Sequence, residues 1–190
     1  IVVFGTVGAM IYGSKSLDIL NFPSHLRKTF SKPELQPEAL IPQLVRFAEK
    51  ARREGLLSLE REVKEANDPF LKQGLQLVAD GTDPEIVKSI LLVQLDQQAM
   101  RHDRVAKLYE AGGGYAPTVG IIGAVLGLIA VMEHLDQGIS KVGPGIAVAF
   151  VATIYGLVLA NMLLFPMASK LRLMSTDEQL LRELILEGIL

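Results

Sequence analysis

The sequence predicts an all-α integral membrane protein, and the distribution of charge along the chain is the main reason. Fifteen of the 19 Lys and Arg residues and fifteen of the 21 Asp and Glu residues lie between Lys15 and Glu110. Residues 111–132 and 142–169, by contrast, contain no charged side chain over 22 and 28 positions. A bilayer core of about 30 Å requires roughly 20 helical residues, so both stretches can be transmembrane helices. A buried core helix is the alternative, but such helices are usually shorter.

Composition excludes several classes of function. The net charge of −2 argues against a nucleic-acid partner, which normally selects a basic surface. The chain has no Cys, which excludes disulfides, thiolate metal sites and cysteine nucleophiles. Its three His residues do not lie at metal-ligand spacing, and no acid–base constellation is recognisable. We therefore expect no enzyme, no metal and no cofactor.

The first segment, residues 1–14, is apolar but short. Thirteen helical residues cover only about 20 Å, and the basic start and cleavage site of a signal peptide are absent. We interpret the segment as the remainder of a transmembrane helix, with an upstream span missing from this sequence.

Basic residues predict the topology. They precede or follow the apolar segments at Lys15, Arg27, Lys28, Lys32, Arg101, Arg104, Lys107, Lys170 and Arg172. The positive-inside rule then places residues 15–110 and the tail in the cytoplasm. The predicted order begins with a partial transmembrane helix (1–14) and a helical cytoplasmic domain (15–110). A transmembrane hairpin follows, in which a periplasmic link (133–141) joins two transmembrane helices (111–132 and 142–169). A cytoplasmic helical tail (170–190) ends the chain.

The cytoplasmic region carries helix punctuation and no strand-like alternation. Pro37-Glu38 predicts a helix start, and Asp68-Pro69 predicts the cap of a short helix that closes at Gly81. Asp83-Pro84 repeats the start signal, and a helix of about 25 residues should run from there to Glu110. The following Ala111–Gly114 lacks the Gly-Lys-Ser/Thr of a phosphate loop. We expect a glycine-rich joint between a cytoplasmic and a membrane helix.

Small residues form a stripe on each predicted transmembrane helix, at Gly120, Gly123 and Gly127 and at Ala149, Ala152 and Gly156. Small side chains let helix backbones approach closely in lipid. The stripes can pack within one subunit, or they can pack between subunits or against a partner helix. We favour the second reading because one hairpin does not need two small-residue faces. Neither full span holds an ionisable side chain. If ions move here, the titrating carboxylate must come from another chain or from upstream residues.

Three segments together resemble the MotA/PomA family, the A subunits of the bacterial flagellar stator within the MotA/TolQ/ExbB proton channel superfamily. They are KARREGLLSLE (Lys50–Glu60), the first full span with its glycine entry (Gly112–Met132) and the second full span (Gly143–Pro166). The resemblance implies a non-enzymatic subunit in the inner membrane, with five copies around two single-span MotB/PomB-type subunits that supply an intramembrane Asp. It also implies that ion passage turns the ring, and that the cytoplasmic insert contacts the rotor protein FliG.

The resemblance also assigns residues. The family's charged rotor-contact positions correspond to Arg52 and Glu60, with Arg53 beside the first. In a continuous helix their offset would be about 80° and 12 Å, so both could lie on one side. An ordinary solvated face is the alternative reading. The family's paired prolines correspond to Pro117 and Pro166, where proline can let a helix end shift, or can simply punctuate it.

The coupling ion follows from two further positions. Sodium-driven relatives carry Thr in both hairpin helices, and this chain retains one as Thr153 but has Ala124 at the other. Alanine supplies no oxygen ligand for a dehydrated sodium ion, so protons are favoured. A hydroxyl bonded to its own helix is the alternative for Thr153. Two other functions stay open: a TolQ/ExbB-type energiser of an outer-membrane system, and a membrane scaffold without ion flux.

Overall fold

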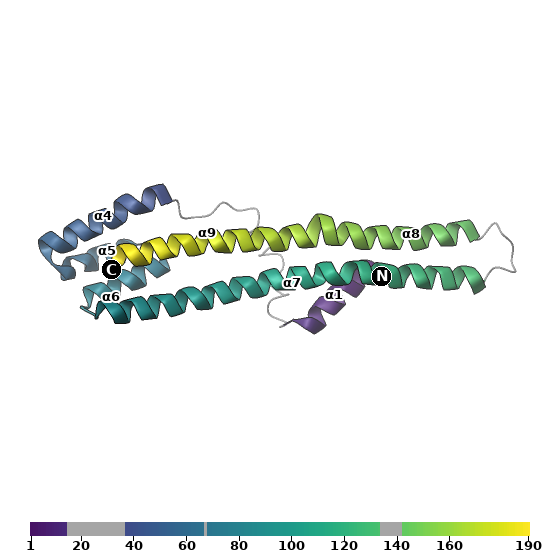
Figure 1. The fold of residues 1–190 in the computed structure, drawn as a ribbon, viewed down its shortest axis with the longest axis horizontal. Coiled ribbons are helices and arrows are strands. Elements are labelled where there is room, and N and C mark those ends of the chain that lie inside the picture. The colour runs from purple at the N-terminus through teal and green to yellow at the C-terminus, as the bar shows by residue number, and fades with distance from the viewer. Residues whose placement is uncertain (15–36, 67, 134–141) are drawn as a thin grey trace. The chain divides into compact units, whose positions relative to one another are not determined.

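The computed structural model describes residues 1–14, 37–66, 68–133 and 142–190, and within these ranges it contains helices and no strands. The all-α prediction is therefore confirmed. The elements, shown in Figure 1, are α1 (Val2–Gly13), α4 (Pro37–Glu54), the 3₁₀ turn η1 (Leu56–Ser58), α5 (Leu59–Glu65), α6 (Pro69–Ala79), α7 (Pro84–Glu133), α8 (Val142–Val158), the π-helical segment η4 (Leu159–Leu164) and α9 (Phe165–Ile189).

The chain divides into two compact units. The insert unit consists of Lys32–His102 and Leu173–Leu190, and the span unit consists of Ile1–Ser31 and Asp103–Arg172. Helices α7 and α9 each contribute a segment to both units. The expected basic residues before Lys32, and all of the periplasmic link except its first residue, lie outside the described residues.

The predicted helix starts of the insert unit are confirmed. Asp68 caps α6, because its Oδ1 accepts a hydrogen bond of 2.8 Å from the Leu71 N–H. After α6 the chain reverses at Gly81, whose φ of 73° is readily adopted only by glycine. Asp83 then accepts a hydrogen bond from the Glu85 N–H at 2.9 Å and starts α7.

The core of the insert unit gathers apolar side chains from α4, α5, α6, α7 and α9. Phe70, Leu91 and Ile185 are fully buried at its centre. Gly74 lets α6 approach the C-terminal end of α9, because a Cβ there would lie 2.5 Å from Cδ1 of Ile189. The C-terminal helix is therefore part of this core.

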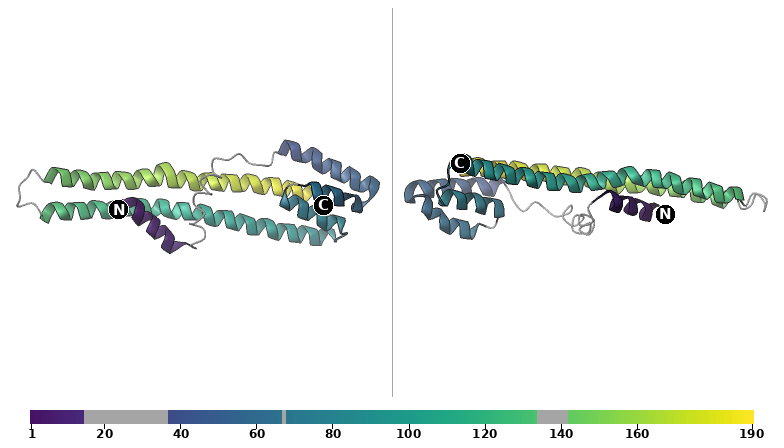
Figure 2. Two further views of the ribbon diagram at one scale, coloured as in Figure 1. Left: turned by 180° about the vertical axis from the view of Figure 1, so that it is seen from behind. Right: turned by 90° about the horizontal axis from the view of Figure 1, so that it is seen from below.

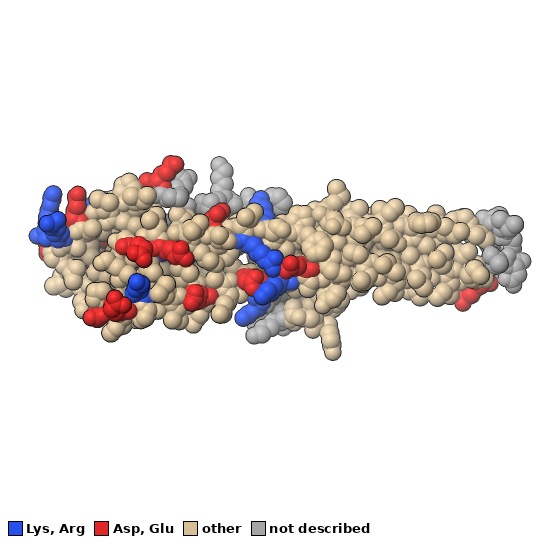
Figure 3. Space-filling model, viewed as in Figure 1, with Lys and Arg blue, Asp and Glu red and all other residues tan. Residues whose placement is uncertain are grey.

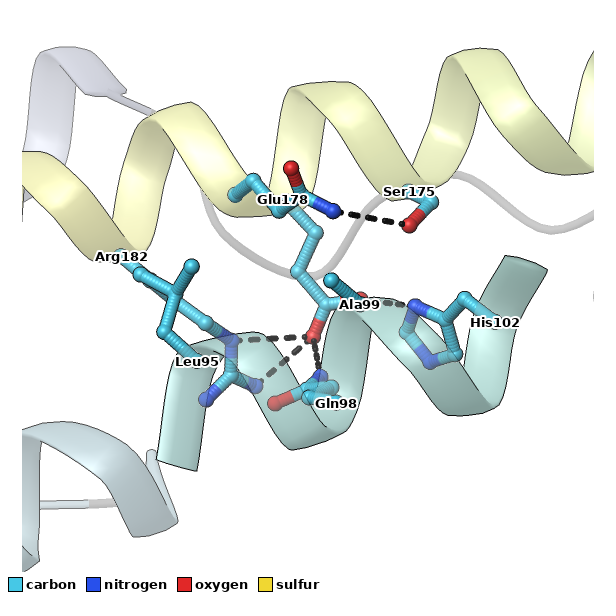
Figure 4. A pocket seen from close by; sticks show the side chains of 8 residues that line it. Leu95, Gln98, Ala99, His102, Ser175, Glu178 and Arg182 are labelled. Carbon is cyan, nitrogen blue, oxygen red and sulfur yellow. Dashed lines mark hydrogen bonds and ion pairs between the residues drawn. The ribbon is translucent and has the colours of Figure 1, made fainter. Parts of the chain in front are cut away.

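A polar junction joins α7 to α9 inside the insert unit. The Glu178 carboxylate accepts hydrogen bonds from Gln98 Nε2 at 2.6 Å and from Arg182 Nη2 at 2.7 Å, and lies 3.6 Å from His102 Nδ1 (Figure 4). Arg182 also stacks over the Phe70 ring at 5.1 Å. The space among these side chains admits no water, so the cluster serves packing and holds no ligand.

Helix α7 continues through the glycine run, and the predicted joint at Ala111–Gly114 is wrong. The helix extends from Pro84 to Glu133 without a break. Packing explains this: a Cβ on Gly112 would lie 2.5 Å from Sδ of Met10, and one on Gly113 would lie 2.7 Å from the Phe165 ring. These glycines serve close helix contacts, which outweigh their low helix propensity of roughly 1 kcal/mol each relative to alanine.

The small-residue stripes of α7 and α8 face each other within the span unit. A Cβ on Gly156 would lie 2.6 Å from the Ala116 carbonyl oxygen, and one on Gly120 would lie 3.0 Å from that of Ala152. Further along, Gly127 is similarly close to Ala149. Our preference for packing between subunits is therefore wrong for these stripes, which bring two backbones together in one hairpin. Figures 1 and 2 show α7 and α8 side by side.

Two helical runs are long and apolar enough to cross a membrane, Pro84–Glu133 and Val142–Ile189. Only 22% of the apolar window in each is buried, unlike the core helix of a soluble protein. Figure 3 shows the hairpin surface without Lys or Arg along its length, while charged side chains gather at one end of it. Helix α1 is apolar but shorter, as predicted.

Replacing Gly156 by alanine should destabilise the hairpin. The new Cβ would overlap the backbone oxygen of Ala116, and overpacking costs about 1–3 kcal/mol. The control is Gly114→Ala, because a Cβ there meets nothing within 4 Å. Thermal unfolding in detergent should show a lower midpoint for Gly156→Ala and an unchanged or higher one for Gly114→Ala. Equal midpoints would contradict backbone contact at Gly156.

Candidate functional site

The three predicted rotor-contact side chains are exposed in the insert unit. Arg52 and Arg53 lie in the last turn of α4, and Glu60 lies in the first turn of α5. None of the three makes an ion pair or side-chain hydrogen bond with the part of the chain that the structure describes. They are therefore available to a partner.

These residues do not share a continuous helix, so the angular offset expected for one does not apply. Helix α4 ends at Glu54, and Gly55 adopts a φ of 86°, which only glycine readily accepts. The 3₁₀ turn η1 follows before α5 begins at Leu59. The contact positions consequently lie on two helices, and their arrangement depends on the angle between α4 and α5.

An acidic residue that the sequence analysis did not select joins these two helices. Glu62 of α5 is only 8% exposed, yet its carboxylate contacts Lys50 Nζ at 2.8 Å and Arg46 Nη2 at 3.0 Å, both on α4. The hydrogen bond from Lys50 lowers the pKa of Glu62, against the opposing effect of burial. Arg46 and Lys50 are four residues apart, a spacing that places both side chains on one face of a helix. No neighbouring residue in the sequence indicated that Glu62 is the carboxylate that pairs with them.

This carboxylate bridges the break at Gly55 and thereby sets how Arg52, Arg53 and Glu60 are presented. Because the pKa of Glu62 is lower in the folded state, its contribution to stability is full at neutral pH. That contribution is lost as the pH falls through the lowered pKa.

In the span unit, Thr153 uses its hydroxyl within its own helix. Its Oγ1 donates to the Ala149 carbonyl oxygen at 3.3 Å, which matches the alternative stated for this residue. Ala124 is half-buried on α7, one helical turn beyond Gly120. Gly120 lies against Thr153 of α8, because a Cβ on Gly120 would be 3.4 Å from the Thr153 Cα. Both positions thus belong to the α7–α8 contact.

Both prolines lie inside continuous helical runs and do not mark helix ends. Pro117 lies within α7 and lacks the N–H that would bond to the Gly113 carbonyl. Gly113 packs against the ring of Phe165, the residue before Pro166. The fold therefore brings the two proline segments together, which their separation in sequence did not reveal.

The segment before Pro166 is π-helical. In η4 the Phe165 N–H bonds to the Ala160 carbonyl, five residues earlier, and Asn161 Nδ2 donates to the Leu157 carbonyl at 2.9 Å. Segments of this kind are wider than an α-helix and often occur at functional sites. Ala160 and Leu164 of η4 pack around Tyr109 of α7, and burial raises the pKa of Tyr109 to about 12.

The chain is similar to known proteins in sequence and in fold. Residues 62–183 match the MotA/TolQ/ExbB proton channel family. The whole chain is 36% identical to Motility protein A of Borreliella burgdorferi, over 73% of that protein, and 38% identical to Motility protein A of Bacillus subtilis, over 70% of it. The solved flagellar MotAB stator complex from Bacillus subtilis superposes with a TM-score of 0.92 at 36% identity, over 99% of this chain and 74% of that one.

An apolar hairpin with a helical insert defines a membrane-bound subunit of the ion-channel type. The chain belongs to the MotA/TolQ/ExbB proton channel family. Within that family it is a stator subunit of the bacterial flagellar motor.

Glu62→Gln should loosen the contact between α4 and α5. Glutamine keeps one acceptor oxygen but replaces the other with an amide nitrogen that cannot accept. One of the hydrogen bonds from Lys50 and Arg46 is therefore lost and the other loses its anionic acceptor, and bonds of this class are worth about 1.5–3 kcal/mol. Hydrogen exchange of the full chain should show faster exchange in α4 and α5, together with weaker motility. The matched control is Glu65→Gln, because Glu65 is exposed and unpaired among the described residues. Equal effects from both variants would contradict the bridge.

Proposed function

We propose that this chain, with a MotB/PomB-type single-span partner, couples proton flow across the bacterial inner membrane to torque on the flagellar rotor. The observation that carries the proposal is the full-length likeness to a MotAB stator complex, combined with three exposed and unpaired charges at the positions expected to contact a rotor. No chemical reaction on a substrate is needed for this role.

The partner supplies what the hairpin lacks. Residues 111–132 and 142–169 contain no Asp, Glu, Lys, Arg or His, whereas an ion path through a membrane usually requires such a side chain. An intramembrane Asp on the single-span subunit fills this role, within a ring of five copies of this chain around two partners. The exposed apolar side chains of α8, among them Val148, Phe150 and Ile154, offer surface to neighbours and lipid.

The insert delivers the torque. Arg52, Arg53 and Glu60 present both signs of charge, and complementary charges on FliG would orient the two surfaces during contact. The contact between Gly113 and Phe165 supports a movement in which the two proline segments shift together as the ion passes.

Protons are the transported ion in this proposal. Ala124 provides no oxygen ligand, so Thr153 is left as the one hydroxyl of the two positions that carry Thr in sodium-driven relatives. The similarity to stator proteins favours this function over that of a TolQ/ExbB-type energiser. A membrane scaffold, the other alternative, would conduct no ions.

Arg52→Glu and Glu60→Lys should each impair swimming while leaving expression and membrane insertion intact. Exposed charges contribute only about 0–1 kcal/mol to folding, so the loss should arise at the rotor. Reversing an opposing charge on the rotor protein should partly restore motility. Swimming and ion conductance are measured in the same strains.

Normal swimming in both mutants and in their combination would contradict the rotor-contact assignment. A fall in conductance together with motility would instead show that Arg52 and Glu60 hold the subunit together.

Swimming driven by this stator should persist without sodium and stop when a proton uncoupler is added. The physical reason is the absence of an oxygen ligand at Ala124. Swimming speed is recorded while external sodium varies at constant proton-motive force. Speed that follows sodium would contradict the assignment of the proton.

A further inference from the structure

A cavity of about 340 Å³ lies within the span unit, between α1 and α7. Its walls include Met10, Ser14, Arg104, Lys107, Leu108 and Tyr115. The volume falls within the range of ligand pockets, about 300–1,000 Å³. None of the residues discussed above for torque or ion passage lines it. Figures 1 and 2 show α1 lying against the middle of α7, where the cavity is located.

The charge of this cavity is positive. Arg104 and Lys107 line it, and none of the described residues that line it carries a carboxylate. Arg104 is exposed and makes no ion pair with the described part of the chain. Lys107 contacts Asp103 at 2.7 Å, whereas Arg172, 3.8 Å from Asp103, has Glu110 as its nearer partner at 2.6 Å. Arg104 is thus the cation without a described counter-ion, and it gives the cavity a net positive charge that suits an anion.

The rest of the lining is apolar and lies where the charge-free part of α7 begins. Met10 and Leu108 form an apolar wall, and Tyr115 is 40% exposed, with its hydroxyl on the α1 side. Gly13 makes room for that hydroxyl, which lies 3.6 Å from where a Cβ would be. An aromatic ring with a polar tip, next to basic side chains, is typical of the membrane interface.

We propose that this cavity binds the headgroup of an anionic phospholipid from the cytoplasmic leaflet. The lipid phosphate contacts Arg104 and Lys107, the glycerol region lies beside the hydroxyls of Ser14 and Tyr115, and an acyl chain follows Met10 and Leu108. Basic pockets between membrane helices on the cytoplasmic side have this chemistry. The inference rests on the membrane placement given under the proposed function.

A lipid fits this site better than a soluble anion because the open side of α1 is strongly apolar. Val7, Ile11 and Tyr12 of α1 are all more than 40% exposed. None of these three side chains lines the cavity, so they form an apolar surface on α1 outside it. A soluble phosphate would use only the two basic side chains and would leave that surface uncovered. A lipid can place its headgroup in the cavity and an acyl chain along that surface.

The test measures lipid retained by the complex with its single-span partner. The complex is purified from nanodiscs of phosphatidylglycerol mixed with phosphatidylcholine and weighed by native mass spectrometry. Arg104→Gln/Lys107→Gln should lower phosphatidylglycerol affinity about twenty-five-fold, because each basic side chain near an anionic surface contributes roughly five-fold. The matched control is Arg101→Gln, which removes a charge from an exposed site outside the cavity and should retain the lipid.

A second variant, Ala111→Trp, fills the cavity wall without changing charge and should also reduce retained phosphatidylglycerol. Equal retention of the neutral and the anionic lipid, or equal losses in the double variant and in Arg101→Gln, would overturn the proposal. Displacement of the lipid by millimolar inorganic phosphate would assign the site to a soluble anion. If the variant Ala111→Cys cross-links to a neighbouring subunit, a protein and not a lipid covers the cavity.

These outcomes are independent of the motor function. A complex that still conducts protons and drives swimming but retains no anionic lipid overturns only the lipid site. A complex that retains the lipid without conducting protons overturns only the proposed function.

Discussion

Direct backbone contact between α7 and α8 determines the arrangement of the span unit. Glycine at positions 120 and 156 leaves the backbones of the two helices separated by little more than their own carbonyl groups. In a membrane, where burial of apolar surface provides no driving force between helices, such packing and its dispersion energy must hold the hairpin. The larger apolar side chains of both helices consequently point away from the contact, toward neighbours and lipid. A hairpin closed by small residues therefore leaves its outer surface for assembly.

The same close packing joins the two prolines. Pro117 removes one hydrogen bond from α7, and the π-helical turns before Pro166 loosen the other helix at the level of Phe165. Gly113 lets the Phe165 ring lie against α7 at this level. Weakened hydrogen bonding on both sides of one contact is a suitable place for a helix to change its path. Tyr109, fully buried beside η4, anchors the neighbouring turn of α7.

Electrostatics is arranged differently in the two units. In the insert unit, Glu62 is buried with two cations and holds α4 and α5 across a break, so that nearby charges at Arg52 and Glu60 can stay solvent-exposed. In the span unit, residues 111–132 and 142–169 carry no charge. Glu110 precedes the first of these stretches, Arg172 follows the second, and the two side chains pair at 2.6 Å. Glu110 lies one helical turn after Lys107, and its pairing with Arg172 makes it less available to Lys107. Ion pairs within the chain thus neutralise Glu62 and Arg172, while exposed charges such as Arg52 and Glu60 remain available to partners.

The sequence by itself determined the fold class, the two membrane-crossing runs and most helix starts in the insert. Those features depend on local properties: uninterrupted apolar length, and caps such as Asp68 or Asp83 that act within three residues. The residues predicted to contact the rotor, Arg52, Arg53 and Glu60, were selected by resemblance, and the structure adds that they are exposed. Only the tertiary structure decided that α7 continues through its glycines, that the small-residue stripes face each other, and that Glu62 pairs with Arg46 and Lys50. Each of these depends on groups that are distant in sequence, because the free space beside a glycine or the partner of a buried carboxylate is set by whichever helix packs there.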